Sequence, residues 1–149
     1  MKNDFLIYQQ EVADALNDDR WMIEHRCKAI AEDVANVDTA IDEQLNQANG
    51  ISLVIRTPAG KFLGDEGDKI RINADPFVIQ ITELPATNRA QAGGTTALGC
   101  LARLIFALRQ SGWAFIGYRQ TDSPDGSVSV ITANFRTTFT ISDPAEIQK

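Results

Sequence analysis

The stretch from Phe77 to Gln110 constrains the fold most, because it combines a strand pattern, a loop and a helix pattern in succession. Residues 77–84 are mainly β-branched, aromatic and apolar, which favours a strand. The run begins after Pro76, whose missing N–H does little harm at the start of a strand, and Pro85 ends it. We therefore predict a strand that stops at Pro85.

The second half of the stretch has the spacing of an amphipathic helix. Its apolar residues recur at three- and four-residue steps, namely Ala97, Leu101, Leu104, Ile105 and Leu108. Thr95 or Thr96 can cap the first turn through its hydroxyl, and Gly112 follows as a C-terminal stop. A stripe of this width needs a sheet to cover it, so we expect this helix at the centre of the fold.

The loop over residues 86–94 ends with Gly93-Gly94 immediately before Thr95-Thr96. Backbone N–H groups and the helix dipole favour an anion at such a place. A phosphate-binding loop, however, needs a lysine just before the Ser/Thr, and a dinucleotide loop needs a third glycine at set spacing. Neither is present, so we interpret this segment as a hinge and a helix cap, with an anion site as the alternative.

Length and charge limit the classes of protein that the chain can represent. The 149 residues suffice for one domain, which removes about two-thirds of the unfolded chain's surface from water. A net charge of −6 disfavours a general attraction to nucleic acid or to anionic membranes. No signal peptide is recognised and no apolar run approaches the ~20 residues that span a bilayer, so we expect synthesis in a reducing cytoplasm.

The single histidine and the two cysteines do not form a recognisable site. Cys27 and Cys100 lie far apart in the sequence and resemble small buried hydrophobes, with no CxxC pair for metal or redox chemistry. His25 lies two residues from Cys27 on what we predict to be the apolar face of one strand. A zinc site needs three or four ligands, and no residue is identifiable as orienting a Cys–His pair. We therefore expect no metal and no cofactor.

The remaining chain divides into elements by the period of its apolar residues and by its turn residues. We predict a helix over 4–16, a strand over 21–27, an acidic amphipathic helix over 30–47, a strand over 51–57, a long polar loop over 59–68, a short strand over 69–73, a strand over 113–120, a turn over 122–126 and a last strand over 128–141. In the last strand the apolar parity switches near Val130-Ile131, which predicts a bulge or burial on both faces.

This order of elements indicates an α+β domain. We expect a mostly antiparallel sheet of about four to six strands, a long central helix and two further amphipathic helices. Residues 1–141 form a single domain in this interpretation, and residues 142–149 form a loose C-terminal tail. The Asp65-Glu66-Gly67-Asp68 cluster is interpreted as a solvated turn, because it lacks the ligand spacing of a calcium loop.

Four features together resemble the tail proteins of tailed bacteriophages and prophages, and among these the tail-terminator family. They are the N-terminal helix, the acidic helix before Ile51, the run from Glu83-Leu84-Pro85 to Asn88-Arg89, and Gly94-Thr95-Thr96-Ala97 at the start of the central helix. The resemblance spans most of the chain and rests on element order and short motifs.

The resemblance implies a non-enzymatic part of the virion. Such a subunit forms a homohexameric ring at the end of the tail tube, terminates tube growth and joins the tail to the neck. Its partners are the tube protein and a neck or head-completion protein. DNA passes through the ring without specific binding, and no membrane is involved. The protein is made in the bacterial host cytoplasm and ends in the virion.

Two sets of residues are expected to serve the ring. Asn88 and Arg89 lie in an otherwise uncharged loop, where the arginine can pair with a carboxylate on a neighbouring subunit or on the tube protein. Asp65, Glu66 and Asp68 can line a channel that repels DNA phosphates, with the acidic face of the 30–47 helix as the alternative lining.

Two other classes of function stay open on the sequence. A head-closure or other neck connector protein would have the same composition and would also form a ring. Only its binding partner distinguishes it from a tail terminator. A small-molecule-binding enzyme is the second class, with Glu83, Arg89 and Gly93-Gly94 as its candidate site.

Overall fold

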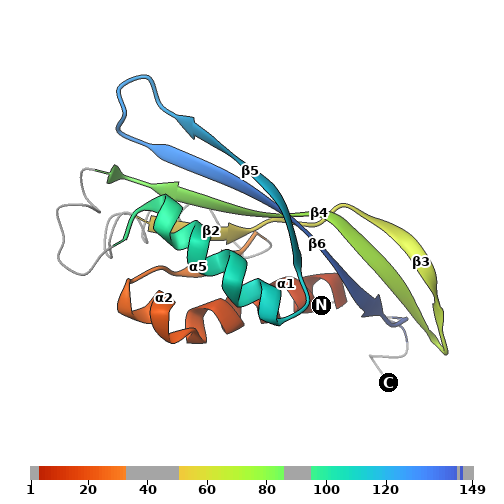
Figure 1. The fold of residues 1–149 in the computed structure, drawn as a ribbon. Helices are drawn as coiled ribbons and strands as arrows, with labels where there is room; N and C mark the ends of the chain where they lie inside the picture. The colour runs from red at the N-terminus through yellow and green to blue at the C-terminus, as the bar shows by residue number, and fades with distance from the viewer. Residues whose placement is uncertain (1–3, 33–50, 86–94, 144, 146–149) are drawn as a thin grey trace.

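The computed structural model describes residues 4–32, 51–85, 95–143 and 145, which form an α+β fold of six strands and three helices (Figure 1). In chain order the elements are α1 (Asp4–Asp18), α2 (Arg20–Glu24), β1 (Ala29–Ala31), β2 (Ile51–Ile55), β3 (Gly60–Glu66), β4 (Lys69–Glu83), α5 (Ala97–Gln110), β5 (Ala114–Asp122) and β6 (Ser129–Ile141). The predicted fold class is thus confirmed. No helix in these ranges is long and apolar enough to cross a membrane.

The two longest strands, β4 and β6, pair antiparallel and form the middle of the sheet. The strand order is β1-β2-β4-β6-β5, and β3 pairs with the first half of β4. Only the short β1–β2 pair is parallel among the described strands. The β3–β4 hairpin therefore extends beyond the helices at one end of the sheet, while the β5–β6 hairpin extends at the other (Figure 1).

The helices α1 and α5 pack on one face of this sheet and enclose the core. Alternate residues of the two central strands point into it, namely Phe77, Ile79 and Ile81 of β4 and Ile131, Ala133 and Phe135 of β6, all 0% exposed. From the helices come Val12, Ala13, Leu16, Cys100, Leu101 and Leu104. The intervening residues of β4 and β6 are half-buried or exposed. Among the described elements, the helices thus cover one face of the sheet. On the other face β4 and β6 are half-buried or exposed, whereas Ser52 and Val54 of β2 are buried.

The central helix forms as its sequence predicts. The Thr96 side chain caps α5 by accepting a hydrogen bond from the backbone N–H of Gly99 at 3.0 Å. The chain leaves the helix through Gly112, whose φ of +85° favours glycine. The predicted stripe, including Leu101 and Leu104, faces the sheet, and Ile105 is half-buried and packs against the core. The N-terminal helix is confirmed as well.

The predicted strand over 21–27 is wrong, because residues 20–24 form the helix α2. Asp19 caps this helix by accepting from the backbone N–H of Met22 at 3.1 Å. The same carboxylate pairs with Arg103 of α5, with 2.6 Å between Oδ1 and Nη2. A local cap and a distant ion pair therefore override the period-two pattern. Ile30 likewise lies in strand β1 rather than in a helix, and residues 33–50 lie outside the described ranges.

The predicted loop over 59–68 is also wrong, because residues 60–66 form β3 and pair with β4. This strand is exposed almost throughout, so no apolar alternation marks it in the sequence. The predicted short strand over 69–73 and the strand ending at Pro85 are one strand, β4, with an irregularity between Ala74 and Phe77.

The expected parity switch in the last strand does not occur. β6 buries alternate residues from Ser129 to Phe139 without a break. The irregularities lie instead in its two partners, between Ala74 and Phe77 of β4 and between Phe115 and Gly117 of β5. Because the extra residues lie in β4 and β5, the alternation of buried and exposed residues along β6 is not interrupted. Strand β2 is buried on both faces, beyond the single apolar face that was predicted.

Candidate functional site

The acids predicted to line a channel lie at the tip of the β3–β4 hairpin. Asp65 and Glu66 end β3, Asp68 follows in the turn, and all three are exposed. The hairpin also carries Lys61, Lys69 and Arg71, so its acids and bases are equal in number over residues 60–71. Glu66 lies 3.8 Å from Arg71, between Oε2 and Nε. The tip is therefore charged but balanced, and a channel lining stays a prediction.

The residues of the predicted interface and of the alternative enzyme site are placed only in part. Asn88, Arg89, Gly93 and Gly94 lie outside the described residues. Glu83 is described, and its side chain is buried with 1% exposure. Its Oε1 accepts a hydrogen bond from the backbone N–H of Ala97 at 3.1 Å. The carboxylate thus satisfies the positive end of α5, where a helix favours negative charge.

The two cysteines come together in the core under the first turn of α5. Both are free and buried. A hydrogen bond with the Cys27 thiol is the main cause, and burial the second, that raises the pKa of the Cys100 thiol well above its usual value. A raised pKa keeps the sulfur protonated, which is the opposite of what a nucleophile or a metal ligand requires. Their predicted role as small buried hydrophobes is confirmed.

The prediction that His25 and Cys27 share one face of a strand is wrong, because His25 lies at the C-terminal end of α2. Its ring stacks on Trp21 with 4.0 Å between ring centroids, and its Nδ1 lies 2.9 Å from the Trp21 carbonyl oxygen. Across the described ranges, no group of three or more His, Cys, Asp or Glu side chains is arranged to hold a metal ion.

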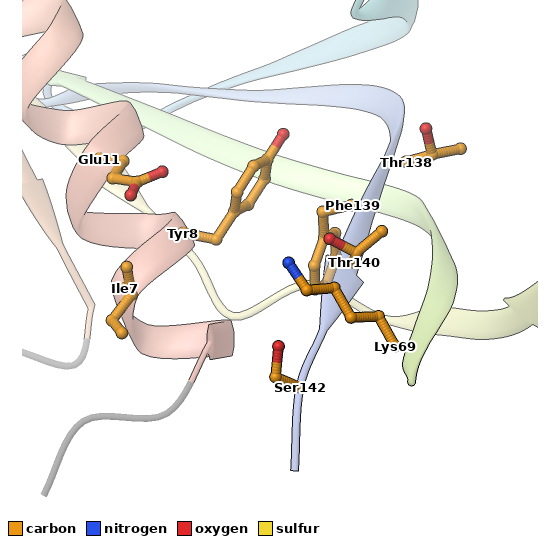
Figure 2. Close-up of a pocket in the computed structure, with 8 residues that line it drawn as sticks. All are labelled: Ile7, Tyr8, Glu11, Lys69, Thr138, Phe139, Thr140 and Ser142. Atoms are coloured by element: carbon orange, nitrogen blue, oxygen red, sulfur yellow. The ribbon is translucent and has the colours of Figure 1, made fainter. Parts of the chain in front are cut away.

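A pocket of about 340 Å³ lies between α1 and the end of β6 (Figure 2). Tyr8 and Glu11 line it from α1, and Lys69 reaches into it from the start of β4. Tyr8 stacks on Phe139 with 4.8 Å between ring centroids. The lining is completed by residues Thr138, Thr140 and Ser142. The lining residues include neither His nor Cys, the side chains that most often serve as bases or nucleophiles near neutral pH.

Two apolar patches on opposite edges of the sheet are further candidate surfaces. The first, the β5 patch, consists of Phe115, Ile116 and Tyr118, which are 36%, 51% and 52% exposed. Their strand forms the outer edge beside β6, so alternate backbone N–H and C=O groups point outward there. Phe115 stacks near Tyr118, with ring centroids 6.5 Å apart.

The second, the hairpin patch, consists of Phe62, Leu63 and Ile70 on the β3–β4 hairpin, 64%, 48% and 38% exposed. β3 lies on the side of β4 opposite to β6, so this patch and the β5 patch occupy different edges (Figure 1). Sequence reasoning missed it, because the segment reads as a polar loop. The adjacent large apolar residues Phe62-Leu63 inside that polar stretch are the signal that could have revealed it.

Comparisons of the chain with protein-family models and with curated proteins find no match.

Proposed function

We propose that this protein is a structural subunit that assembles head to tail into a closed ring. We propose further that the ring is a part of a bacteriophage virion, where it terminates the tail tube and joins the tail to the neck. The observation that carries the ring is the pair of unlike apolar edges, the β5 patch and the hairpin patch.

Unlike edges favour one kind of assembly over another. Exposed strands with large apolar side chains are interaction surfaces in soluble proteins, because free edges otherwise cause uncontrolled pairing. A two-fold dimer that pairs like patches would use one patch and leave the other exposed. When the β5 patch of one copy instead contacts the hairpin patch of the next, the contact is heterologous and gives a ring where its rotation closes. The closed ring is the form that we propose.

The phage assignment is supported by the resemblance of the element order and of the short motifs near Glu83 and Thr96 to tail-terminator proteins. In that setting the partners are the tail tube protein and a neck or head-completion protein. The mass of the assembly in solution, combined with negative-stain images, tests the ring, for which we expect six copies. Mixing the ring with tail tubes of the same phage tests the cap: rings should sit at one tube end and stop further growth.

A complementation experiment tests the head-to-tail contact. Ile116→Lys removes the β5 patch and Phe62→Lys removes the hairpin patch, and both positions are more than half exposed, so each variant should fold. Each variant alone should stay monomeric. An equimolar mixture should give dimers but no rings, because one intact junction remains between the two variants. If neither substitution changes the mass of the wild-type assembly, these edges are not the interfaces.

The second candidate, a head-closure protein, shares this ring and differs in its partner. It is favoured if the rings bind neck assemblies but ignore tube ends. The enzyme class is tested by a thermal-shift scan with nucleotides and phosphorylated metabolites, since a ligand at a hundred times its Kd stabilises a protein by about 2.7 kcal/mol. Glu83, one of the residues on which that class depends, is buried and accepts a hydrogen bond from the N–H of Ala97.

A further inference from the structure

The open face of the sheet, defined as the face away from α1 and α5, concentrates positive charge. Besides Lys69, which pairs with Glu66 and lines the pocket beside α1, the strand pairing places four basic residues on it. Lys61 of β3 lies opposite Asn73, and Arg71 of β4 lies opposite Thr140. Arg136 of β6 lies opposite Ala114, and Arg119 of β5 lies opposite Thr132. All four basic side chains are exposed. We call Lys61, Arg71, Arg119 and Arg136 the basic face.

Few acids lie on the same surface among the described residues, and Glu32 beside it is paired with Arg56, whose guanidinium also bonds to Gln80 of β4. Among the paired positions of β3, β4, β5 and β6, the register places one acid, Glu66, on the open face. Asp65 pairs with Ile70 and Asp122 pairs with Ser129, so both belong to the helix-covered side. The one acid lies 3.8 Å from Arg71, and both side chains are about half exposed, so it offsets the basic face only weakly.

Helix α1 carries the opposite charge. Glu11, Asp14 and Asp18 are exposed along it at three- and four-residue steps, and the helix contains no basic residue. The net charge of −6, taken over all 149 residues, does not show this separation of acids and bases. A polyanion that approaches the sheet is attracted or repelled by the charges near it, and the net charge of the whole chain does not describe these local charges.

The residues around the basic face match phosphate groups better than a protein surface. Its neighbours are amides and hydroxyls, namely Asn73, Asn134, Thr132, Thr138 and Thr140. Protein interfaces are enriched in arginine too, but they have aromatic and apolar centres, whereas the residues beside these bases are polar. Contacts to nucleic acid backbones, by contrast, come from Arg, Lys, Thr and Asn side chains. We propose that the basic face binds the phosphate backbone of nucleic acid without reading its bases.

The dimensions agree with a backbone contact. Arg71 and Arg119 stand opposite Thr140 and Thr132 of β6, eight residues apart, which is roughly 26 Å along a strand. That length covers about eight steps of a duplex at 3.4 Å each. Four phosphate contacts predict a slope between about −3 and −4 in a plot of log K against log salt. Backbone contact reads no sequence, so it is compatible with the passage of DNA without specific binding.

Binding by one chain does not depend on the proposed ring, although a ring would multiply it. Each copy in a ring repeats the basic face, so simultaneous contacts raise the overall affinity well above that of one chain. The Ile116→Lys variant, which we expect to be monomeric, separates the two questions. It should still bind duplex DNA, more weakly, if the basic face acts alone.

Fluorescence anisotropy with a labelled 20-base-pair duplex, measured from about 25 to 200 mM NaCl, tests the proposal. The test variant is Arg71→Gln/Arg136→Gln. The control is Arg20→Gln/Arg109→Gln, which makes the same change in net charge at exposed positions of α2 and α5. We expect the test variant to lose tenfold or more in affinity at the lowest salt and to lower the slope by about two. The control should bind like the wild type, and two duplexes of unrelated sequence should bind equally.

Several outcomes would overturn the proposal. They are an absence of wild-type binding at 25 mM NaCl, equal losses in the test and control variants, and a preference for one duplex. If the test variant alters the mass in solution while DNA binding stays unchanged, the basic face is a protein interface instead. An Arg71→Lys/Arg136→Lys variant retains both charges and should restore binding, and circular dichroism melts establish that every variant is folded.

Discussion

At the scale of single residues, Asp19 connects three segments of the fold. Its carboxylate caps α2 through the N–H of Met22 and pairs with Arg103 on α5 through both carboxylate oxygens, at 2.6 and 3.1 Å. The hydrogen bond from Arg103 outweighs the opposing effect of burial and lowers the pKa of Asp19 below its usual value. The carboxylate is therefore stabilised in its charged form.

This lowered pKa predicts a pH dependence of stability. A group whose pKa is depressed by folding stabilises the protein above its unfolded pKa, near 3.8, and loses this contribution as the pH falls through the folded value. Asp19→Asn keeps a good cap but removes the charge, so it should cost about 1–3 kcal/mol at pH 7. Denaturant melts of both proteins should converge below pH 4. A constant difference between them would contradict the role of the charge.

The buried carboxylate of Glu83 leads to a second prediction. Glu83→Ala should destabilise the fold by about 1–3 kcal/mol, because the N–H of Ala97 then lies buried without that acceptor. Glu83→Gln retains the oxygen acceptor and should cost less. Urea unfolding of the two variants is the measurement, and equal losses would mean that the charge rather than the hydrogen bond stabilises α5.

At the scale of elements, α5 is specified by its own sequence, whereas the β3–β4 hairpin is specified by pairing. The apolar stripe, the Thr96 cap and Gly112 all lie within or next to the helix and agree with one another. In the hairpin, β3 has little apolar surface to bury, and its regular structure depends on the hydrogen bonds that β4 supplies. The hairpin turns at Gly67, whose φ is +65°.

Leu104 offers a test of the core role of α5. It is 0% exposed, so Leu104→Ala should cost about 2–5 kcal/mol in denaturant unfolding. Leu98 lies on the same helix and is 47% exposed, so Leu98→Ala is the matched control and should change stability by less than about 0.5 kcal/mol. A loss below that value for Leu104→Ala would show that the stripe does not hold the core.

At the scale of the whole molecule, the two apolar edges, the acidic helix α1 and the basic face give the subunit distinct sides. The patches on β5 and on the β3–β4 hairpin lie at opposite edges, and the basic face lies on the sheet side away from α1 and α5. A subunit with unlike sides can meet neighbours and a passing polyanion on separate surfaces. Assembly and DNA contact can therefore be perturbed independently.

Arg89 provides a prediction for assembly that rests on the sequence alone. Arg89→Ala should leave the melting of the isolated subunit unchanged and should weaken the ring, if its guanidinium pairs with a carboxylate across subunits. Native mass spectrometry over a range of protein concentrations compares the variant with Arg89→Lys, which keeps the charge but not the planar fork. Unchanged rings in both variants would make the loop a simple connector.

The sequence by itself determined the elements whose signals are local. It identified the end of β4 at Pro85, α1, α5 with both of its ends, and the buried cysteines, because periodicity, caps and turn residues act within a few positions. It also determined the α+β class, since that follows from the order of such elements. In contrast, α2 and β3 were missed, because a distant ion pair and a partner strand decide them.

Only the tertiary structure decided where the surfaces lie. Phe62 and Ile116 became parts of opposite edges through strand order, which no local pattern encodes. Glu83 became a buried acceptor at the start of α5, because α5 packs its N-terminus over the end of β4. The net charge of −6 does not say where the charges lie. The pairing register places Lys61, Arg71, Arg119 and Arg136 on the sheet face away from the acids of α1. Register and packing join residues that are far apart in the chain, and this is why the surfaces became visible only in three dimensions.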